Sequence, residues 1–167
     1  MNPILKTISV VLLASASVIV SAAEPASAPA ADKQPGPNPA KQAISVRKAT
    51  FTLIGNSFKP IADAAQGKAE YNQADIQKRA NRIVVLSEFL DGAFPESSNL
   101  GEPDTKAKAD IWTTKTEFDK KLKEFQEHAA TLAKVSATEK TASDAFKEAF
   151  GVVAKDCKSC HESFKVK

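Results

Sequence analysis

The sequence predicts an all-α protein, an antiparallel four-helix bundle, from three observations. Apolar side chains recur at spacings of three and four residues in four separate segments, and this spacing is the period of a helix. Alanine, lysine and glutamate are abundant while glycine is scarce, a composition that favours helices over sheets. Most of the segments are joined by short connections, and helices joined in this way pack side by side in alternating directions.

The chain begins with a segment typical of an export signal. Met1 to Lys6 carries one positive charge, Thr7 to Val20 is apolar, and Ser21-Ala22-Ala23 supplies the small residues needed for cleavage. We expect residues 1–23 to be a cleaved signal peptide, which places the mature protein in the periplasm without membrane insertion. An uncleaved membrane anchor is the alternative, but the apolar run is short for a membrane span. Residues 24–42, rich in proline and alanine, are expected to form a flexible leader.

The folded part is expected to span residues 43–167, beginning with two amphipathic helices. The first is predicted from about Ala43 to Gln66 and the second from about Gln73 to Asp91. Asn72 is a candidate cap for the second helix and Gly92 a candidate stop. The inner faces are expected to carry Ile44, Arg47, Phe51, Ile54, Phe58 and Ile61 on the first helix, and Ile76, Ala80, Ile83, Leu86 and Leu90, with Val85 and Phe89 beside them, on the second.

Two further helices are predicted in the C-terminal half. The connection from Gly92 to Thr113 is long for a loop, so a short helix around Ala107 to Trp112 is expected within it. Thr114-x-x-Glu117 and Ser136-x-x-Glu139 match the capping-box pattern and are taken as the starts of the third and fourth helices. Their inner faces would present Phe118, Leu122, Phe125, Ala129 and Leu132 on the third helix, and Phe146, Phe150, Val153, Cys157, His161 and Phe164 on the fourth.

Cys157-Lys158-Ser159-Cys160-His161 has the spacing of a covalent haem c attachment site. The chain contains two cysteines and two histidines, and three of these residues fall within this pentapeptide. On a helix the two cysteines and His161 share one face. We therefore predict one haem c per chain in the bundle core, with Cys157 and Cys160 as thioether attachments and His161 as an axial iron ligand.

Three other interpretations of the pentapeptide are weaker. A thioredoxin-like pair follows a strand, whereas this pair lies within a predicted helix. A structural zinc site requires a fourth ligand, and the chain has no second cysteine pair. A disulfide at this spacing on a helix would be strained.

The other side of the iron has few candidate ligands. The only methionine is Met1, which leaves with the signal peptide, and lysines are usually solvated. His128 flanks the apolar face of its helix and is expected to be partly exposed. A five-coordinate iron in an apolar pocket would bind small neutral gases. The alternative is a six-coordinate, low-spin electron-transfer cytochrome with His128 or a lysine as sixth ligand.

Arg47 and Phe51 are candidate haem contacts on the first predicted helix. Arg47 is a charge among apolar positions, and it either reaches solvent or faces a haem propionate. We favour the propionate because a haem is expected in the core. Phe51, one turn further on, is the apolar side chain best placed to face the iron, although this role is compatible with ordinary packing.

Enzymatic and nucleic-acid functions have little support. The first helix carries no histidine or paired acid that could manage proton transfer, so no enzymatic activity such as that of a peroxidase is expected. The net charge of +3 and the lack of a dense basic stripe give nucleic-acid binding no electrostatic basis.

Three stretches resemble the cytochrome c′ family, and the resemblance covers roughly residues 43–167. They are Arg47-Lys48-Ala49-Thr50-Phe51-Thr52-Leu53-Ile54, Thr105-Lys106-Ala107-Lys108-Ala109-Asp110-Ile111-Trp112, and Phe146 through Phe164 with the haem attachment motif. The resemblance implies a periplasmic haem protein, often a homodimer, with five-coordinate high-spin iron that binds nitric oxide and carbon monoxide. A periplasmic redox partner of unknown identity is also expected.

The resemblance also implies roles for particular residues. Phe51 matches the family's distal residue, and Arg47, with Lys48 beside it, matches the arginine near the propionates. Thr105 and Lys106 correspond to a segment that passes the haem edge. Lys165 stands where the family often has arginine, and lysine offers a single charge rather than a planar fork.

Overall fold

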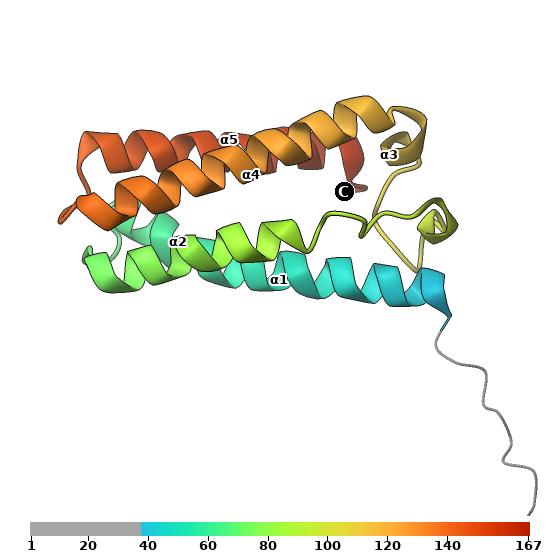
Figure 1. The fold of residues 1–167 in the computed structure, drawn as a ribbon, viewed down its shortest axis with the longest axis horizontal. Coiled ribbons are helices and arrows are strands. Elements are labelled where there is room, and N and C mark those ends of the chain that lie inside the picture. The colour runs from blue at the N-terminus through green and yellow to red at the C-terminus, as the bar shows by residue number, and fades with distance from the viewer. Residues whose placement is uncertain (1–37) are drawn as a thin grey trace, which may run out of the picture. The chain divides into compact units, whose positions relative to one another are not determined.

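The computed structural model describes residues 38–167 and folds them into an antiparallel four-helix bundle, as the sequence predicts (Figure 1). Its elements are α1 (Pro39–Ala65), α2 (Gln73–Glu88), the 3-10 helix η1 (Glu96–Ser98), α3 (Asp110–Thr113), α4 (Lys115–Thr138) and α5 (Asp144–Phe164). Within these residues the extended structure is limited to an isolated bridge between Ala107 and Lys165. The predicted signal peptide, residues 1–23, and the leader as far as residue 37 lie outside the described residues.

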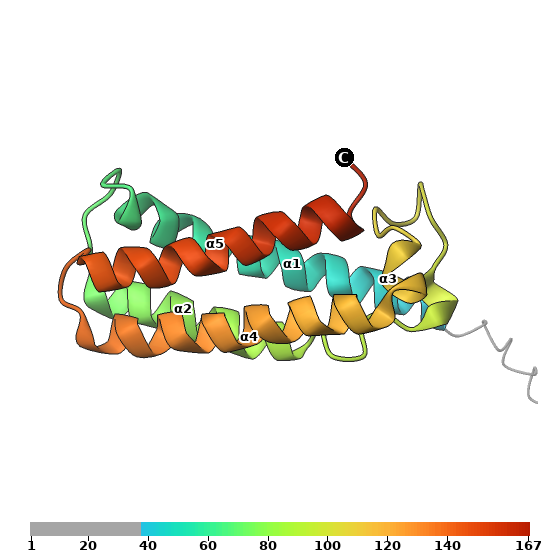
Figure 2. The same ribbon diagram turned by 90° about the horizontal axis from the view of Figure 1, so that it is seen from above.

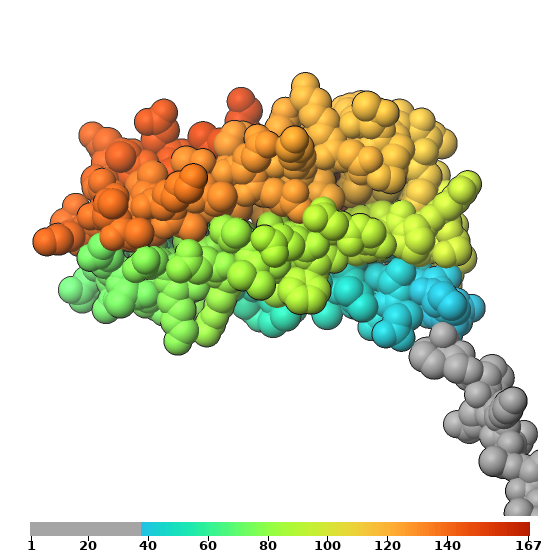
Figure 3. Space-filling view, viewed as in Figure 1, coloured from blue at the N-terminus to red at the C-terminus, as the bar shows by residue number. Residues whose placement is uncertain are grey.

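The four long helices alternate in direction, so that each runs opposite to the one before it (Figure 1). Helix α1 packs on α2 and α5, and α4 packs on the same two helices. The α2 and α4 side chains meet along the face seen in Figure 3. The interface between α1 and α5 is the sparsest of the four, and Figure 2 shows these two helices lying one over the other. None of the described helices combines the length and apolarity needed to cross a membrane.

A continuous apolar core fills the centre of the bundle. Its fully buried members come from all four long helices and include Ile61, Ile83, Leu132, Phe146 and Val153. Burying one such side chain stabilises the fold by about 1.5–3 kcal/mol. Two aromatic pairs, Phe58–Phe150 at 5.2 Å and Tyr71–Phe146 at 4.9 Å between ring centroids, pack α1 and the α1–α2 connection against α5.

The first helix begins at Pro39 rather than near Ala43, so it includes the last residues of the expected leader. Asn38 caps α1 by accepting a hydrogen bond from the Ala40 main-chain N–H at 2.9 Å. Pro39 occupies the first helical position, where a missing N–H has no cost. The second helix begins as predicted, with Asn72 accepting from the Asp75 N–H at 3.0 Å, but it ends at Glu88 in a series of turns.

Neither predicted capping box forms, although α4 does begin directly after Thr114, as predicted. Thr114 precedes α4, but its hydroxyl donates to the Asp110 carbonyl oxygen at 2.7 Å rather than capping the helix. Ser136 lies inside α4, buried, and donates to the Leu132 carbonyl oxygen at 2.7 Å. The last helix starts later and is capped by Ser143, which accepts from the Phe146 N–H at 3.2 Å.

The buried face of α2 is narrower than the sequence predicts. Val85 and Phe89, expected beside the inner face, are 55% and 59% exposed. The short helix expected around Ala107 to Trp112 begins later, as α3, and η1 was not anticipated.

Candidate haem-binding site

A cavity of about 400 Å³ lies between α1 and α5, where these helices pack most sparsely. Its apolar wall comes from four different elements and connections, through Phe94, Ile111, Phe118 and Phe164. The remaining lining residues are Arg47, Lys48, Phe51, Thr52, Thr105, Lys106, Ala107, Cys160, His161 and Lys165. This set contains almost every candidate contact residue that the sequence singled out.

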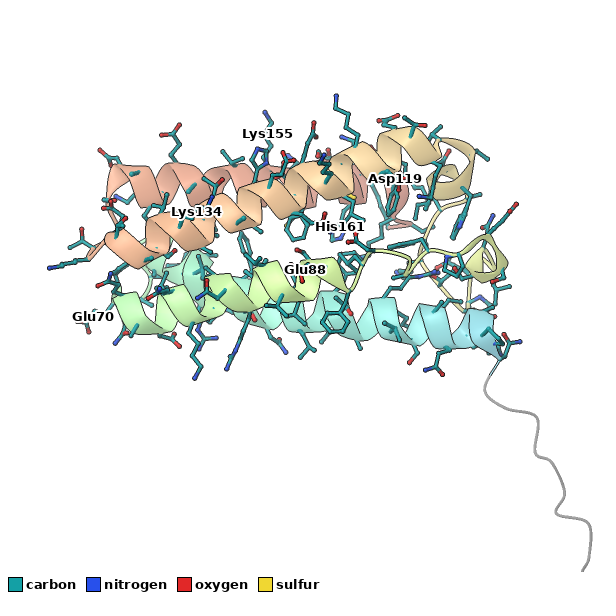
Figure 4. All side chains as sticks on the ribbon, in the orientation of Figure 1. Glu70, Glu88, Asp119, Lys134, Lys155 and His161 are labelled. Atoms are coloured by element: carbon teal, nitrogen blue, oxygen red, sulfur yellow. The ribbon has the colours of Figure 1, made fainter. Side chains whose placement is uncertain are left out.

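Helix α5 carries the three residues predicted to hold the haem. Cys160 and His161 line the cavity; Cys160 is half-buried, whereas His161 is exposed although the sequence places it on the inner face. Figure 4 labels His161. Cys157, one turn earlier on the same helical face, is half-buried and packs against the apolar core rather than forming the cavity wall. The two cysteines do not form a disulfide.

The two thiols are held in their protonated form. Burial, the negative charge of Asp156 and the neighbouring Cys160 raise the pKa of Cys157 to about 11. Burial also raises the pKa of Cys160, although the positive charge of Lys121 acts in the opposite direction. Desolvated, protonated thiols are poor nucleophiles, so this pair is poorly suited to disulfide exchange.

His161 faces Phe51 across the cavity. The two rings meet edge to face with centroids 6.1 Å apart. Contacting aromatic pairs have centroids about 4.5–7 Å apart, so the two rings touch, and a planar group would lie between them only after one ring moved outward. Desolvation lowers the pKa of His161, and the positive charge of Lys165 lowers it further, so the imidazole is neutral at physiological pH and can donate a lone pair.

Arg47 is the most deeply buried charged group at the cavity. Its side chain is 3% exposed, so the alternative in which it reaches solvent is wrong. The guanidinium donates to the Ser98 hydroxyl at 2.7 Å, to the Ser98 carbonyl oxygen at 3.2 Å and to the Thr105 hydroxyl at 2.8 Å. It also lies 5.0 Å from the centroid of the Phe94 ring.

The described residues give Arg47 no acidic partner, which points to an anion supplied from elsewhere. None of the hydrogen-bond acceptors that it contacts is a carboxylate. Burial lowers the pKa of Arg47 from its ordinary value, yet the group stays charged at neutral pH. A buried, uncompensated cation is costly, and an anionic group in the adjacent cavity would offset that cost.

Three lysines, Lys48, Lys106 and Lys165, line the same cavity and are exposed to solvent. Two main-chain hydrogen bonds join the segments that carry Lys106 and Lys165. The Lys108 N–H donates to the Phe164 carbonyl oxygen at 2.9 Å, and the Val166 N–H donates to the Lys106 carbonyl oxygen at 2.8 Å.

His128 lies away from this cavity. It is half-buried on α4, as expected, and its Nδ1 is 2.7 Å from an Asp156 carboxylate oxygen on α5. Its ring lines a separate groove between these two helices, together with Thr131 and Glu148. The structure therefore does not bring His128 to the face opposite His161.

Phe94, which lines the cavity, and Ser98 and Trp112, which contact its lining residues Arg47 and Phe94, could not be found from the sequence. Phe94 lies in the connection after Gly92, where no periodicity marks an inward side chain, and Ser98 is a buried serine in η1. Trp112 donates its indole N–H to the Phe94 carbonyl oxygen at 3.0 Å and thereby fixes this segment. The only sequence feature that could have indicated Phe94 is that an aromatic residue occurs in a largely polar connection.

The lining of the cavity fits a haem. The aromatic wall of Phe94, Phe118 and Phe164, next to Phe51 and His161, matches an apolar macrocycle. The buried guanidinium of Arg47, which has no carboxylate among its contacts, matches an anionic propionate. Two thiols and an imidazole on one face of α5 match the groups that attach and ligate a c-type haem.

Comparison with known proteins gives a consistent result. The family model described as Cytochrome C' matches residues 42–165. Cytochrome c' from Rhodopseudomonas palustris is 36% identical over 126 residues, which cover 74% of this chain and 82% of that protein.

Two solved structures extend the comparison to the fold. Cytochrome c prime from Shewanella frigidimarina superposes with a TM-score of 0.72 at 33% identity, covering 77% of this chain and 97% of that one. A nitric oxide complex of a variant of cytochrome c prime from Alcaligenes xylosoxidans gives a TM-score of 0.69 at 26% identity, covering 77% and 97%.

Proposed function

This chain belongs to the cytochrome c′ family, and we propose that it is a periplasmic protein whose haem iron binds nitric oxide and carbon monoxide opposite His161. The family carries covalently bound haem c, which is therefore the cofactor of this chain, and its members are haem proteins rather than classical enzymes. The observation that carries the proposal is the pairing of His161 with the apolar ring of Phe51 across the cavity.

In this proposal Cys157 and Cys160 form the two thioethers and His161 ligates the iron. The helical spacing puts all three on one face of α5, and the neutral imidazole has its lone pair available. When bound, the haem supplies an iron atom with a coordination position for a diatomic gas. Arg47 would meet a propionate, with Thr105 orienting the guanidinium, while Lys48, Lys106 and Lys165 would lie around the haem edge.

The five-coordinate state is supported by what lines the cavity. His161 is the only histidine among the lining residues, no methionine is present, and the three lysines are exposed to solvent. Phe51 offers no lone pair and shields the opposite face of the iron from water. A small neutral gas would need only a small displacement of this ring, which is 38% exposed and therefore has solvent to move into.

The nitric oxide complex of the similar Alcaligenes protein supports gas binding. The location of His128 in a separate groove disfavours the low-spin alternative.

Optical and electron paramagnetic resonance spectra of the purified holoprotein, with and without nitric oxide, test the proposal. We expect a high-spin spectrum that changes on adding nitric oxide. Phe51→Ala should accelerate carbon monoxide binding, because it removes the ring that shields the iron, while the matched Phe58→Ala should leave the rate nearly unchanged. A low-spin spectrum that does not respond to either gas would contradict the proposal.

The predicted homodimer is proposed to form through α1 and α2. Val46 and Leu53 lie seven residues apart on α1 and are 39% and 51% exposed. Val85 on α2 and Phe89, the residue directly after this helix, add two exposed apolar side chains, and a groove of about 800 Å³ lies between Leu53 and Val85. A second copy would cover these side chains, since exposed apolar patches of this kind mark interaction sites.

Sedimentation equilibrium of the holoprotein tests this interface. Val85→Glu combined with Phe89→Glu should convert a dimer into a monomer, whereas Leu100→Glu, at an exposed apolar site on another segment, should not. A dimer that survives the α2 double substitution would place the interface elsewhere.

Periplasmic location rests on residues 1–23, which lie outside the described residues. Mass spectrometry of the mature protein should show an N-terminus at Ala23 or Glu24, as expected from the small residues at the cleavage site. A mature chain that retains residues 1–22 would show that the apolar run is not removed.

A further inference from the structure

The charges around the haem cavity have one sign. Four cationic side chains, Arg47, Lys48, Lys106 and Lys165, line it, and no aspartate or glutamate does. Arg47 is buried, whereas the three lysines are exposed. These three, the rim lysines, therefore present positive charge to solvent at the place where a haem edge would lie.

The acidic groups nearest in sequence to the rim are engaged with other lysines. Asp104 lies 3.9 Å from Lys41, and Glu162 lies 3.9 Å from Lys158. Among residues 38–167, neither Lys48 nor Lys165 forms an ion pair within 4.0 Å. Lys106 donates at 3.3 Å to an oxygen of Lys167, the last residue of the sequence, so this lysine is partly neutralised. The positive charge of Lys48 and Lys165 is thus not cancelled locally.

The chain as a whole does not have this excess of positive charge. The whole sequence contains 23 basic and 20 acidic residues, a net charge of only +3. Two haem propionates would reduce the local charge, but in the proposed function the buried Arg47 would face a propionate from the interior. A nearly neutral protein with a locally positive rim has an electric dipole that orients an approaching anionic surface.

We propose that the rim lysines form the docking surface for an electron-transfer protein with an acidic surface. The proposal rests on the proposed function in that it requires a haem in this cavity. In such a complex one electron would pass from the partner, which would be oxidised, to the haem, which would be reduced, and no bond would be formed or broken. Complementary charge would raise the association rate, and in favourable cases it does so by about 10–10³-fold.

A carboxylate-terminated monolayer on gold is a defined anionic surface that tests this docking with the holoprotein. A quartz-crystal microbalance measures the bound protein, and voltammetry measures the electron-transfer rate. The test variant is Lys48→Glu with Lys106→Glu and Lys165→Glu. The control, Lys134→Glu with Lys147→Glu and Lys155→Glu, changes the net charge equally at exposed positions that do not line the cavity. Figure 4 shows Lys134 and Lys155 apart from His161.

At about 0.1 M ionic strength the Debye length is about 10 Å, so the position of a charge matters as well as the total. The rim variant should bind the monolayer at least about tenfold more weakly than the unaltered protein, while the control should lose less than about threefold. Equal losses in the two variants would show that net charge alone acts and would overturn the proposal. Preferential binding of the unaltered protein to an amine-terminated monolayer would also overturn it.

Two further measurements keep this test separate from that of the proposed function. Optical spectra and nitric oxide titration of the unaltered holoprotein report on the haem: failure there rejects the proposed function, whereas normal spectra with indifference to the monolayer reject the docking surface alone. If the rim variant does not retain its haem, the neutral set Lys48→Gln, Lys106→Gln and Lys165→Gln replaces it, with a smaller loss expected in the same direction.

Discussion

Replacement of Arg47 by methionine offers a quantitative test of why a cation lies in the interior. Methionine keeps most of the side-chain volume but removes the three hydrogen bonds to Ser98 and Thr105. The Ser98 hydroxyl would still donate to the Pro95 carbonyl oxygen at 2.7 Å, and the Thr105 hydroxyl would still accept from the Ala107 N–H at 3.1 Å. The Ser98 carbonyl oxygen, in a residue that is 0% exposed, would lose its arginine donor.

An unsatisfied buried carbonyl group costs about 1–3 kcal/mol, and the lost stacking of the guanidinium on Phe94 costs about 1 kcal/mol more. We therefore expect Arg47→Met to lower the free energy of unfolding of the holoprotein by about 2–4 kcal/mol. Urea titration followed by far-UV circular dichroism should show a lower midpoint with an unchanged slope.

Two further variants make the test specific. Lys134→Met removes an exposed charge from α4 and should change the free energy of unfolding by less than about 0.5 kcal/mol. Arg47→Lys keeps the charge but cannot reproduce the planar fork, so it should still be destabilising. An Arg47→Met midpoint no lower than that of Lys134→Met would refute the reasoning, because the buried contacts would then contribute nothing.

Three other substitutions probe the bundle and the ligand set. Burial, and secondarily the negative charge of Glu139, raises the pKa of Tyr71 above its ordinary value of 10.0, so the folded state holds the phenol proton more strongly than the unfolded chain. The free energy of unfolding should therefore fall as the pH rises above 10. Tyr71→Phe should reduce this alkaline loss, as measured by urea titrations at several pH values. His128→Ala should leave the optical spectrum unchanged, since His128 contacts Asp156 and not the cavity, and a change from low to high spin would instead identify it as a ligand. Phe146→Ala should lower the free energy of unfolding by about 3–5 kcal/mol in urea titration, because it empties a fully buried position, and a loss below 1 kcal/mol would mean that the core collapses around it.

The helices and the attachment motif were predictable because both depend on local spacing. Ile54 and Ile61 recur at the helical period, and both are buried in the bundle. The pentapeptide from Cys157 to His161 lies within α5, where spacings of three and four residues bring its reactive groups to one face. These features need no knowledge of what packs against them.

The helix boundaries were less predictable because the same residues serve two purposes. A serine hydroxyl can cap a helix or bond to a carbonyl oxygen within the preceding turn. Ser143 does the first and Ser136 the second, although the capping-box pattern favours Ser136. Asn38 caps the start of α1 within a segment whose composition suggested a flexible leader.

The sequence by itself determined the helical class, most of the inward-facing positions and the residues able to hold a haem, since each follows from periodicity or spacing along one segment. Only the tertiary structure decided where Arg47 points and what surrounds it. Its partners Phe94, Ser98 and Thr105 come from a connection without periodicity, at least 47 positions away in the chain. Their meeting depends on how α1, α5 and that connection pack together, and packing between distant segments leaves no local pattern to detect.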